Sequence, residues 1–456
     1  MGQMSDTHCQ GRPTRRALLR GLGTAGLAGL AGCLDTLGSG GDDAACVSGL
    51  TGGCASYPED VQMFQGNLKR QAHYPDETVP DAVTVDWEVP TNFANHTAAK
   101  STPIPTHDGT IVFGGDKGNL EARRPDGRLR WRDQTDADFR GFHGSPAVVG
   151  DRAYIGGYDG AIYSYDVTTG EQLWKLDNNA LGGTIAVGSS PAFHDGRLYF
   201  IVEYGTPSSG ALWAVDPVTG ETEWGDQRIW GQSHPSPTID RETGHILAGS
   251  NDGVVYSWTY PELEFDWEYQ AGRGDGPDGR EKAGGEFNLG AQIKGTVAAH
   301  EGLGYVGSWD RRLHCIDLSD GSEIWTFDTG RSNMSNPAID PDAGVVYTGS
   351  DSGYVWALDP ETGEELWSAD VDGRVIGALS VTAETVLAGS YDSHLYALDR
   401  TTGERRWRVE NRGKVTSGAV PVDGRIYYAE RATFSSDADG DPVLEQPGHT
   451  YCLSAV

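Results

Sequence analysis

Short apolar runs, separated by glycine-containing turns, recur along most of this chain. In the clearest copy an apolar segment follows Asn336, two more occupy 345–350 and 353–359, and a fourth ends at Trp367. Segments of four to six residues that alternate or run apolar predict β-strands. Asp-Ser-Gly between the second and third segments favours a hairpin turn, and Asp-x-x-Thr-Gly before the fourth favours a turn in which glycine takes a positive φ. The pattern therefore predicts a repeating unit of four short strands.

A tryptophan ends each unit, and successive tryptophans are 40–58 residues apart. Four short strands per repeat of about 40–45 residues are typical of a β-propeller. After Trp407 the chain supplies three strand-like segments but no closing tryptophan, whereas 83–89 is an isolated outer strand one period before Trp131. We therefore expect an all-β, eight-bladed propeller of four-stranded blades over residues 79–456, with the last blade closed by N- and C-terminal strands so that no sheet edge is left open. The tryptophans expected to dock the outer strands are Trp87, Trp131, Trp174, Trp224, Trp267, Trp325, Trp367 and Trp407.

The turn and the tryptophan together form a longer motif, Ala-x-Asp-x-x-Thr-Gly-x-x-x-Trp, at 214–224, 357–367 and 397–407, with close variants at 164–174 and 315–325. This motif resembles the tryptophan-docking motif of the pyrroloquinoline-quinone (PQQ) type propellers, and the resemblance covers residues 79–456. The stretch Met-Phe-Gln-Gly-Asn at 63–67 also resembles a short lead-in found before many such propellers. The family contains both quinoprotein alcohol dehydrogenases and BamB-type assembly lipoproteins, so the resemblance implies the fold and leaves the function open.

The enzymes of this family use PQQ with Ca²⁺ and a catalytic aspartate, and many stack the cofactor against a disulfide between adjacent cysteines. The chain has no adjacent cysteine pair and no Cys-x-x-Cys-His haem motif, and it is shorter than those enzymes. We therefore predict no catalytic, cofactor-binding or metal site and expect no cofactor, with PQQ and Ca²⁺ as the alternative. The acidic run at 437–441 lacks the glutamate that a Ca²⁺ loop places at its twelfth position, so we expect an acidic hairpin loop in the last blade.

The N-terminus has the pattern of an export and lipidation signal. Arg15 and Arg16 form a twin-arginine pair, an apolar run follows, and Leu-Ala-Gly-Cys at 30–33 resembles a lipobox. We expect residues 1–32 to be a Tat-type signal and Cys33 to carry lipid on the outer face of the cytoplasmic membrane, with a simple signal anchor as the alternative. Residues 33–78 are expected to be a flexible tether and N-terminal extension, in which Cys46 and Cys54 form a disulfide or stay free thiols.

The charge of the chain limits its partners. Its 66 acidic and 35 basic residues give a formal net charge of −31, and only seven of the basic residues are lysine. This excludes a general binder of nucleic acid or of anionic membrane surfaces, because both need a basic face. An acidic, lysine-poor surface is typical of a halophilic, haloarchaeal protein, because high salt screens self-repulsion; an ordinary acidic exported protein is the alternative.

Basic residues nevertheless recur at one position of the repeat, just before the first strand. That segment lies at one mouth of the channel in a propeller, so a ring of cations there would attract an anion. The residues expected in this channel-mouth anion site are Lys100, Arg140, His143, His234, Lys294, Arg331, Arg374 and Lys414. The alternative is that these cations pair with nearby aspartates, such as Asp138, Asp226, Asp328 and Asp372.

The sequence thus predicts an exported, membrane-anchored propeller that serves as a non-catalytic binding or scaffold module at the cell surface. Its expected partners are the membrane through the lipid anchor, one or more surface proteins and an anionic small ligand. Two alternatives stay open: a PQQ-dependent dehydrogenase of an alcohol or sugar, and a surface solute-binding or sensor protein. If the source is a halophilic archaeon, an outer-membrane assembly role cannot carry over.

Overall fold

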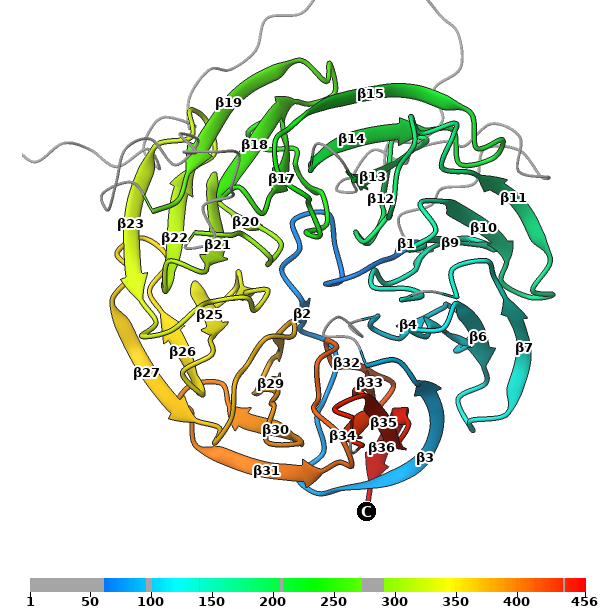
Figure 1. The fold of residues 1–456 in the computed structure, drawn as a ribbon. Helices are drawn as coiled ribbons and strands as arrows, with labels where there is room; N and C mark the ends of the chain where they lie inside the picture. Colours follow the sequence, from blue (N-terminus) through cyan, green and yellow to red (C-terminus); the bar gives the residue numbers. More distant parts are fainter. Residues whose placement is uncertain (1–60, 96–100, 139, 206–207, 273–290, 438) are drawn as a thin grey trace, which may run out of the picture. The chain divides into compact units, whose positions relative to one another are not determined.

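Eight antiparallel sheets surround a central channel in the computed structural model, which describes residues 61–95, 101–138, 140–205, 208–272, 291–437 and 439–456 (Figure 1). Each sheet is one blade, and in seven of the eight blades the four propeller strands run from the channel to the outer rim in chain order. Seven blades consist of four consecutive strands, and the eighth combines segments from the two ends of the described chain. The predicted eight-bladed, all-β propeller is therefore confirmed.

The first four blades each run from an inner strand at the channel to an outer strand at the rim. Blade 1 contains β4 (Ile104–Pro105), β5 (Ile111–Gly114), β6 (Asn119–Arg123) and β7 (Leu129–Gln134). Blade 2 contains β8 (Ala147–Val149), β9 (Arg152–Gly156), β10 (Ile162–Asp166) and β11 (Gln172–Leu176). Blade 3 contains β12 (Ala192–His194), β13 (Arg197–Tyr204), β14 (Ser209–Val215) and β15 (Thr222–Ile229). Blade 4 contains β16 (Thr238–Asp240), β17 (His245–Gly249), β18 (Val254–Thr259) and β19 (Phe265–Gln270).

The remaining blades continue around the ring. Blade 5 contains β20 (Ala298–His300), β21 (Leu303–Ser308), β22 (Arg312–Asp317) and β23 (Glu323–Asp328). Blade 6 contains β24 (Ala338–Asp340), β25 (Val345–Gly349), β26 (Tyr354–Leu358) and β27 (Glu365–Asp370). Blade 7 contains β28 (Ser380–Thr382), β29 (Thr385–Gly389), β30 (His394–Asp399) and β31 (Arg405–Glu410). Blade 8 contains β32 (Val420–Val422), β33 (Arg425–Ala429), β36 (Gly448–Ala455) and, outermost, β3 (Val83–Asn92).

Blade 8 closes the ring as the sequence predicts. The N-terminal strand β3 pairs antiparallel with the C-terminal strand β36, and Trp87 lies opposite Cys452 in that register. The thiols of Cys452 and of Cys315, at the equivalent position of blade 5, are both buried and unbridged. Closure by the two ends means that neither end of the ring presents an unpaired edge to its neighbour.

The docking tryptophans link each blade to the next. Seven of the eight donate the indole N–H to a backbone carbonyl in the adjoining blade or, for Trp407, in the segment before β3. In most copies the glycine of the Thr-Gly turn lies against the tryptophan ring, where a Cβ would come within 2.5–2.9 Å of it, as at Gly403 on Trp367. That contact, together with the positive φ, explains why the turn requires glycine. Trp224 differs because Glu262 and Leu263 replace Thr-Gly in the turn it faces, with Leu263 taking the positive φ, and its ring packs edge-on against Trp258.

A lead-in segment (residues 61–74) crosses one end of the channel. Its strand β1 (Val61–Gln62) pairs with β8, and β2 (His73–Tyr74) pairs parallel with β28. Between these strands its backbone carbonyls accept N–H groups from the innermost strands of blades 4, 5, 6 and 7. The lead-in segment therefore holds half of the ring together from inside, and it spans one end of the channel, which we call the closed end (Figure 1).

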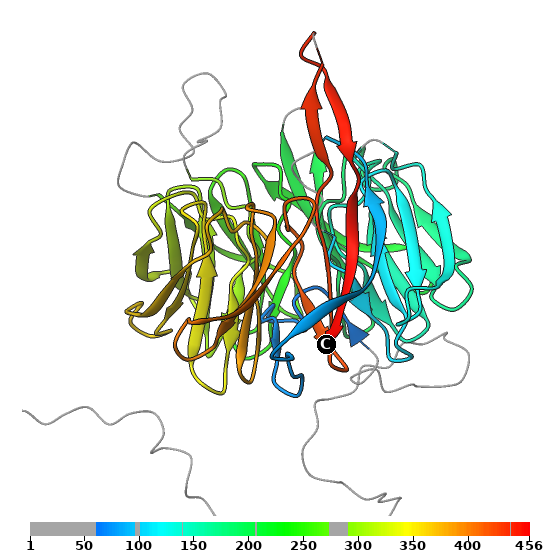
Figure 2. The ribbon, with the colours of Figure 1, turned by 90° about the horizontal axis from the view of Figure 1, so that it is seen from below.

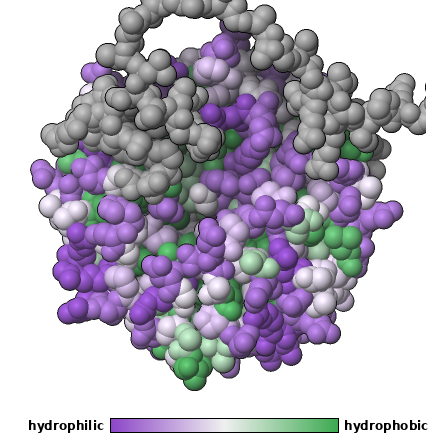
Figure 3. Space-filling model, turned by 180° about the vertical axis from the view of Figure 1, so that it is seen from behind, coloured by the Kyte–Doolittle hydropathy of each residue, from purple (hydrophilic) through white to green (hydrophobic). Residues whose placement is uncertain are grey.

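A two-stranded hairpin, β34 (Thr433–Ser436) and β35 (Pro442–Gln446), projects from the face opposite the lead-in segment (Figure 2). It occupies the loop between β33 and β36, and its turn contains the acidic run predicted as a hairpin loop. Figure 3 shows the face opposite the hairpin, where hydrophilic side chains cover most of the described surface and apolar ones form small separate patches. Among the described residues, the structure contains no helix with the length and apolarity needed to cross a membrane.

Candidate binding site at the channel mouth

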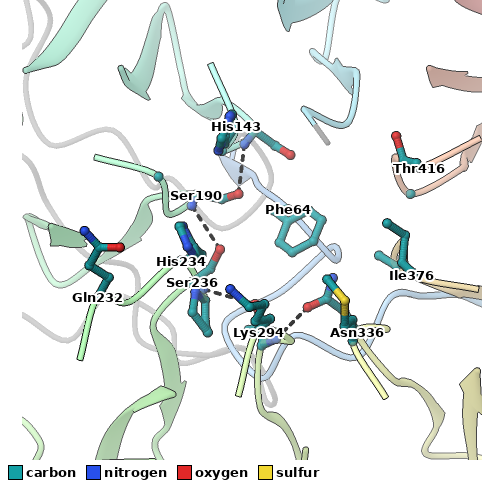
Figure 4. Close-up of a pocket in the computed structure, with 18 of the residues that line it drawn as sticks. Phe64, His143, Ser190, Gln232, His234, Ser236, Lys294, Asn336, Ile376 and Thr416 are labelled. Carbon is teal, nitrogen blue, oxygen red and sulfur yellow. Dashed lines mark hydrogen bonds between the residues drawn. The ribbon is translucent and has the colours of Figure 1, made fainter. Parts of the chain in front are cut away.

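A pocket of about 800 Å³ occupies the channel at the end that the lead-in segment leaves open. Its wall comes from the segments before the inner strands and from the turns between the second and third strands, which is the loop position of the projecting hairpin. Phe64 of the lead-in segment lies at the centre of the pocket and forms its floor (Figure 4). The pocket and the hairpin therefore share one face of the propeller.

A collar of hydrogen bonds fixes the backbone of this wall. Just before six of the eight inner strands, a backbone N–H donates to the side-chain oxygen of the equivalent residue in the next blade. The bonds run from the N–H of Thr102 to Ser145 Oγ, Ser145 to Ser190 Oγ, Ser190 to Ser236 Oγ, Ser236 to Thr296 Oγ1, Thr296 to Asn336 Oδ1 and Gly418 to Thr102 Oγ1, at 2.5–3.0 Å. Because these groups are buried, each bond satisfies a donor that water does not reach. Sequence reasoning missed the collar, although Ser, Thr or Asn followed by Pro marks five of its positions.

One wall of the pocket, from blades 2 to 4, contains a carboxylate bonded to a histidine and a tyrosine. Glu203 is buried, and its Oε1 lies 2.9 Å from His234 Nδ1 and 3.4 Å from the Tyr158 hydroxyl. Tyr158 and His234 Nδ1 are 3.1 Å apart, and the His143 ring lies 3.8 Å from the Tyr158 ring. Burial, and then the Glu203 charge, raise the pKa of Tyr158 well above its ordinary value. The phenol therefore stays protonated and donates, so this wall offers directed hydrogen bonds.

The opposite wall, from blades 6 to 8, gathers positive charge around one tyrosine. The cationic groups of Arg374, Lys414 and Arg431 lie 5.6, 5.0 and 5.6 Å from the centre of the Tyr391 ring. Arg431 also donates from Nη1 to the Tyr391 hydroxyl at 2.6 Å, and Asp351 lies 3.6 Å from Arg374. We call these three cations and Tyr391 the Tyr391 cluster. Burial lowers the pKa of Lys414, and the Arg431 and Arg374 charges lower it further.

A further cation lies between the two walls. Lys294 Nζ is 5.1 Å from the centre of the Trp309 ring, and both residues line the pocket. Burial lowers the pKa of Lys294, while the Glu203 carboxylate acts in the opposite direction. The indole N–H of Trp309 is buried and has no hydrogen-bond partner among the described residues. This part of the pocket therefore places a cation over an indole whose buried N–H is unused by any described residue.

The structure brings most of the cations of the predicted mouth together. Arg140, His143, His234, Lys294 and Arg374 line the pocket, and Lys414 stands beside Tyr391. Arg331 is exposed and does not line the pocket, although the next residue does. Lys100 lies outside the described residues, as do Arg15, Arg16, Cys33, Cys46 and Cys54.

Several pocket residues were not predicted. Tyr391 belongs to a turn between second and third strands and Glu203 to β13, and both line the pocket. Arg431, at the base of the hairpin, does not line the pocket itself but contacts Tyr391. None of the three occupies the repeat position that marked the other cations. Of the aspartates offered as alternative partners, Asp226 does pair with Arg228, whereas Asp372 pairs with Arg408.

The pocket does not fit the calcium-bound form of PQQ. Calcium takes six to eight oxygen ligands and favours several carboxylates. The carboxylates that line the described pocket are Glu203 and Asp351, which lie on opposite walls and already contact His234 and Arg374. The grouping with metal-ligand spacing among the described residues is His73, Asp340 and Asp342, near the closed end, where Arg400 already binds Asp340.

Comparisons with known proteins agree on the fold. Residues 84–327 and 335–441 match the family described as outer membrane protein assembly factor BamB. The BamB of Yersinia pestis is 23% identical over 285 residues, which cover 58% of this chain and 65% of that protein. The chain therefore spans less than two thirds of the curated relatives it matches first.

Two solved structures share the architecture. The quinohemoprotein alcohol dehydrogenase from Comamonas testosteroni superposes with a TM-score of 0.67 at 16% identity, covering 86% of this chain and 80% of the enzyme. BamB from Moraxella catarrhalis superposes with a TM-score of 0.57 at 16% identity, covering 81% of this chain and 99% of that protein. At this level of identity the likeness concerns the fold alone.

Proposed function

The chain belongs to the BamB family of propellers, and from this premise we propose that it is a non-catalytic binding or scaffold module. The observation that carries the proposal is the pocket at the channel mouth. It is about 800 Å³, its polar wall is fixed by the collar, and its cations come from several blades. Such a rigid, polar concavity favours recognition of a partner's protruding group.

The proposed location is the outer face of the cytoplasmic membrane. Support for it comes from the Arg15–Arg16 pair, the apolar run that follows and Cys33, in the order and spacing of a Tat lipoprotein signal.

The proposed partner is a protein that docks on the pocket face. Two apolar side chains are exposed there: Trp230 is 68% exposed just after β15, and Ile185, at the pocket rim, is 46% exposed. Tryptophan is enriched among the residues that contribute most of the binding energy in protein interfaces, so an exposed tryptophan beside a polar pocket favours a protein contact here. The mouth cations Arg140, Lys294 and Arg374 would attract an anionic group of that partner.

The test is recovery of a defined partner from membranes that contain the tagged full-length chain, after cross-linking. The expected partner is recovered with wild type and with Leu366→Ala, a matched control in which a 54% exposed apolar side chain is removed from outer strand β27. Recovery of the partner is reduced at least tenfold with Trp230→Ala, because the exposed indole that the partner contacts is lost. No partner, or equal recovery from all three proteins, contradicts docking on the pocket face.

A PQQ-dependent dehydrogenase is the second candidate, favoured by the fold it shares with quinohemoprotein alcohol dehydrogenase. Calorimetric titration with PQQ and Ca²⁺, followed by dye reduction with an alcohol, tests it. Tight binding with dye reduction would replace the scaffold proposal. Neither signal is expected, because the described carboxylates of the pocket stand apart and are already engaged.

A further inference from the structure

We propose that the pocket binds a dicarboxylate, with one carboxylate on the Tyr391 cluster and the other at Lys294 and Trp309. The ligand is either a free dicarboxylic acid or the acidic end of a peptide. This inference rests on the proposed binding function and names the chemistry of the group that the mouth receives.

The first carboxylate site follows from the charges in the Tyr391 cluster. Lys414 makes no ion pair with a described carboxylate, and the charges acting on it come from Arg374 and Arg431, both of which repel it. An anion in contact with these groups would relieve that repulsion. Arginine binds a carboxylate with two parallel hydrogen bonds, and lysine adds a point charge.

Several described arginines elsewhere are matched by acids. Arg123 and Arg132 share the buried Glu121, Arg425 pairs with Asp86 and Arg228 pairs with Asp226. At the Tyr391 cluster, by contrast, a lysine without a described acid partner stands beside two arginines in a protein of net charge −31. This local excess of positive charge points to an external anion.

The second carboxylate site is Lys294 with Trp309. Lys294 makes no ion pair with a described carboxylate and rests on the Trp309 ring, whose own N–H is buried without a described partner. A single carboxylate accepts from both groups, with one oxygen for the ammonium and one for the indole. A buried donor without an acceptor is costly, so filling it adds affinity.

The surface between the two sites includes apolar side chains beside the polar Asn336. Phe64 at the floor lies between Lys294 and Ile376 in Figure 4, and Ile376 and Met334 also line the pocket. A short hydrocarbon chain that joins two carboxylates would cover these side chains. Inorganic phosphate carries its charge on one centre, so it can occupy only one of the two sites.

The test is calorimetric titration of the full-length chain with acetate, inorganic phosphate and straight-chain dicarboxylates from malonate to suberate. These dicarboxylates carry equal charge and differ in length. Affinity is expected to peak at one length, at least tenfold above acetate, because both sites are then occupied. Affinity that does not depend on length overturns the two-site proposal.

Three variants locate the sites. Arg374→Gln, at a 60% exposed residue, is expected to weaken the best dicarboxylate at least tenfold. Trp309→Phe keeps the ring and removes the N–H, so it should weaken the dicarboxylate severalfold and leave phosphate unchanged, because phosphate is expected at the Tyr391 cluster, where three cations meet. Arg331→Gln removes a mouth arginine that does not line the pocket and should change nothing. Equal losses in all three, or no loss in Arg374→Gln, contradict the assignment.

A peptide ending in two glutamates distinguishes the two sources of the ligand. Tighter binding of the peptide than of any free dicarboxylate assigns the pocket to a partner's acidic end, and the reverse order assigns it to a solute. Partner recovery that survives Arg374→Gln but not Trp230→Ala, without dicarboxylate binding, rejects this inference and keeps the proposed function. Dicarboxylate binding without any recovered partner supports this inference and rejects the proposed docking of a protein partner.

Discussion

The two ends of the channel use arginine in opposite ways. At the closed end Arg70 is fully buried, and its guanidinium donates to the carbonyls of Phe64 and Pro237 at 2.6 and 2.9 Å and to those of Ser190 and Pro191 at 3.4 and 3.3 Å. At the open end Arg374 is 60% exposed, and Asp351 lies 3.6 Å from it. The first guanidinium has its donors committed to the fold, and the second keeps donors for an external partner.

The pKa of the buried Arg70 guanidinium reflects this difference between the two ends. Burial lowers the pKa of Arg70 to about 9, which means that the protein tolerates a charge in a poorly solvated place. It does so because four carbonyl oxygens, contributed by the lead-in segment and by blades 3 and 4, converge on it. Positive charge at the closed end therefore stabilises the ring, whereas positive charge at the open end stabilises a complex.

The largest effect is expected at the closed end. Arg70→Ala leaves four carbonyls without a donor and opens a cavity, so we expect the free energy of unfolding to fall by about 3–4 kcal/mol. Chemical denaturation followed by circular dichroism measures it.

Arg374→Ala is the matched control, and it should stay within about 0.5 kcal/mol of wild type because an exposed side chain contributes little. Similar losses in both variants would mean that the two ends do not differ in the way described.

The sequence was a good guide to the ring because the ring depends on repeated local chemistry. Each Thr-Gly turn and each closing tryptophan must fit the same neighbour geometry, so the same residues return in copy after copy. The shared last blade followed from the same pattern, since Trp87 stood alone one period before Trp131 and three strands remained at the other end.

The pocket could be predicted only in part. Repetition located the segment before each inner strand, and it therefore found Arg140, Lys294 and Arg374. Tyr391 and Arg431 come from loops that differ between blades, so no repeat marks them. Phe64 is brought into the pocket by contacts between the lead-in segment and inner strands more than a hundred residues away, which a local pattern cannot reveal.

The collar lies between the two ends, and breaking it should give an intermediate effect. Ser236→Ala removes the acceptor of the Ser190 N–H, a buried bond of 2.9 Å, and we expect a loss of about 1–2 kcal/mol. Ser436→Ala, on the exposed hairpin, should cost almost nothing. If both variants denature at the same concentration, the collar does not support the pocket wall.

The smallest effect sharpens the description of the open end. Lys414 faces Arg374, Arg431 and Tyr391, and Asp351 lies on the far side of Arg374. Because burial and the two arginines lower the pKa of Lys414, it loses its charge at a lower pH than an ordinary lysine, while burial raises the pKa of Tyr391 and keeps that phenol neutral. Dicarboxylate affinity should therefore fall severalfold as pH rises toward 10. Lys414→Arg retains its charge, so its affinity should fall less than that of wild type over the same range, with the remaining decline coming from Lys294, whose pKa burial also lowers. A parallel decline in both proteins would assign the titration to Lys294 or another group.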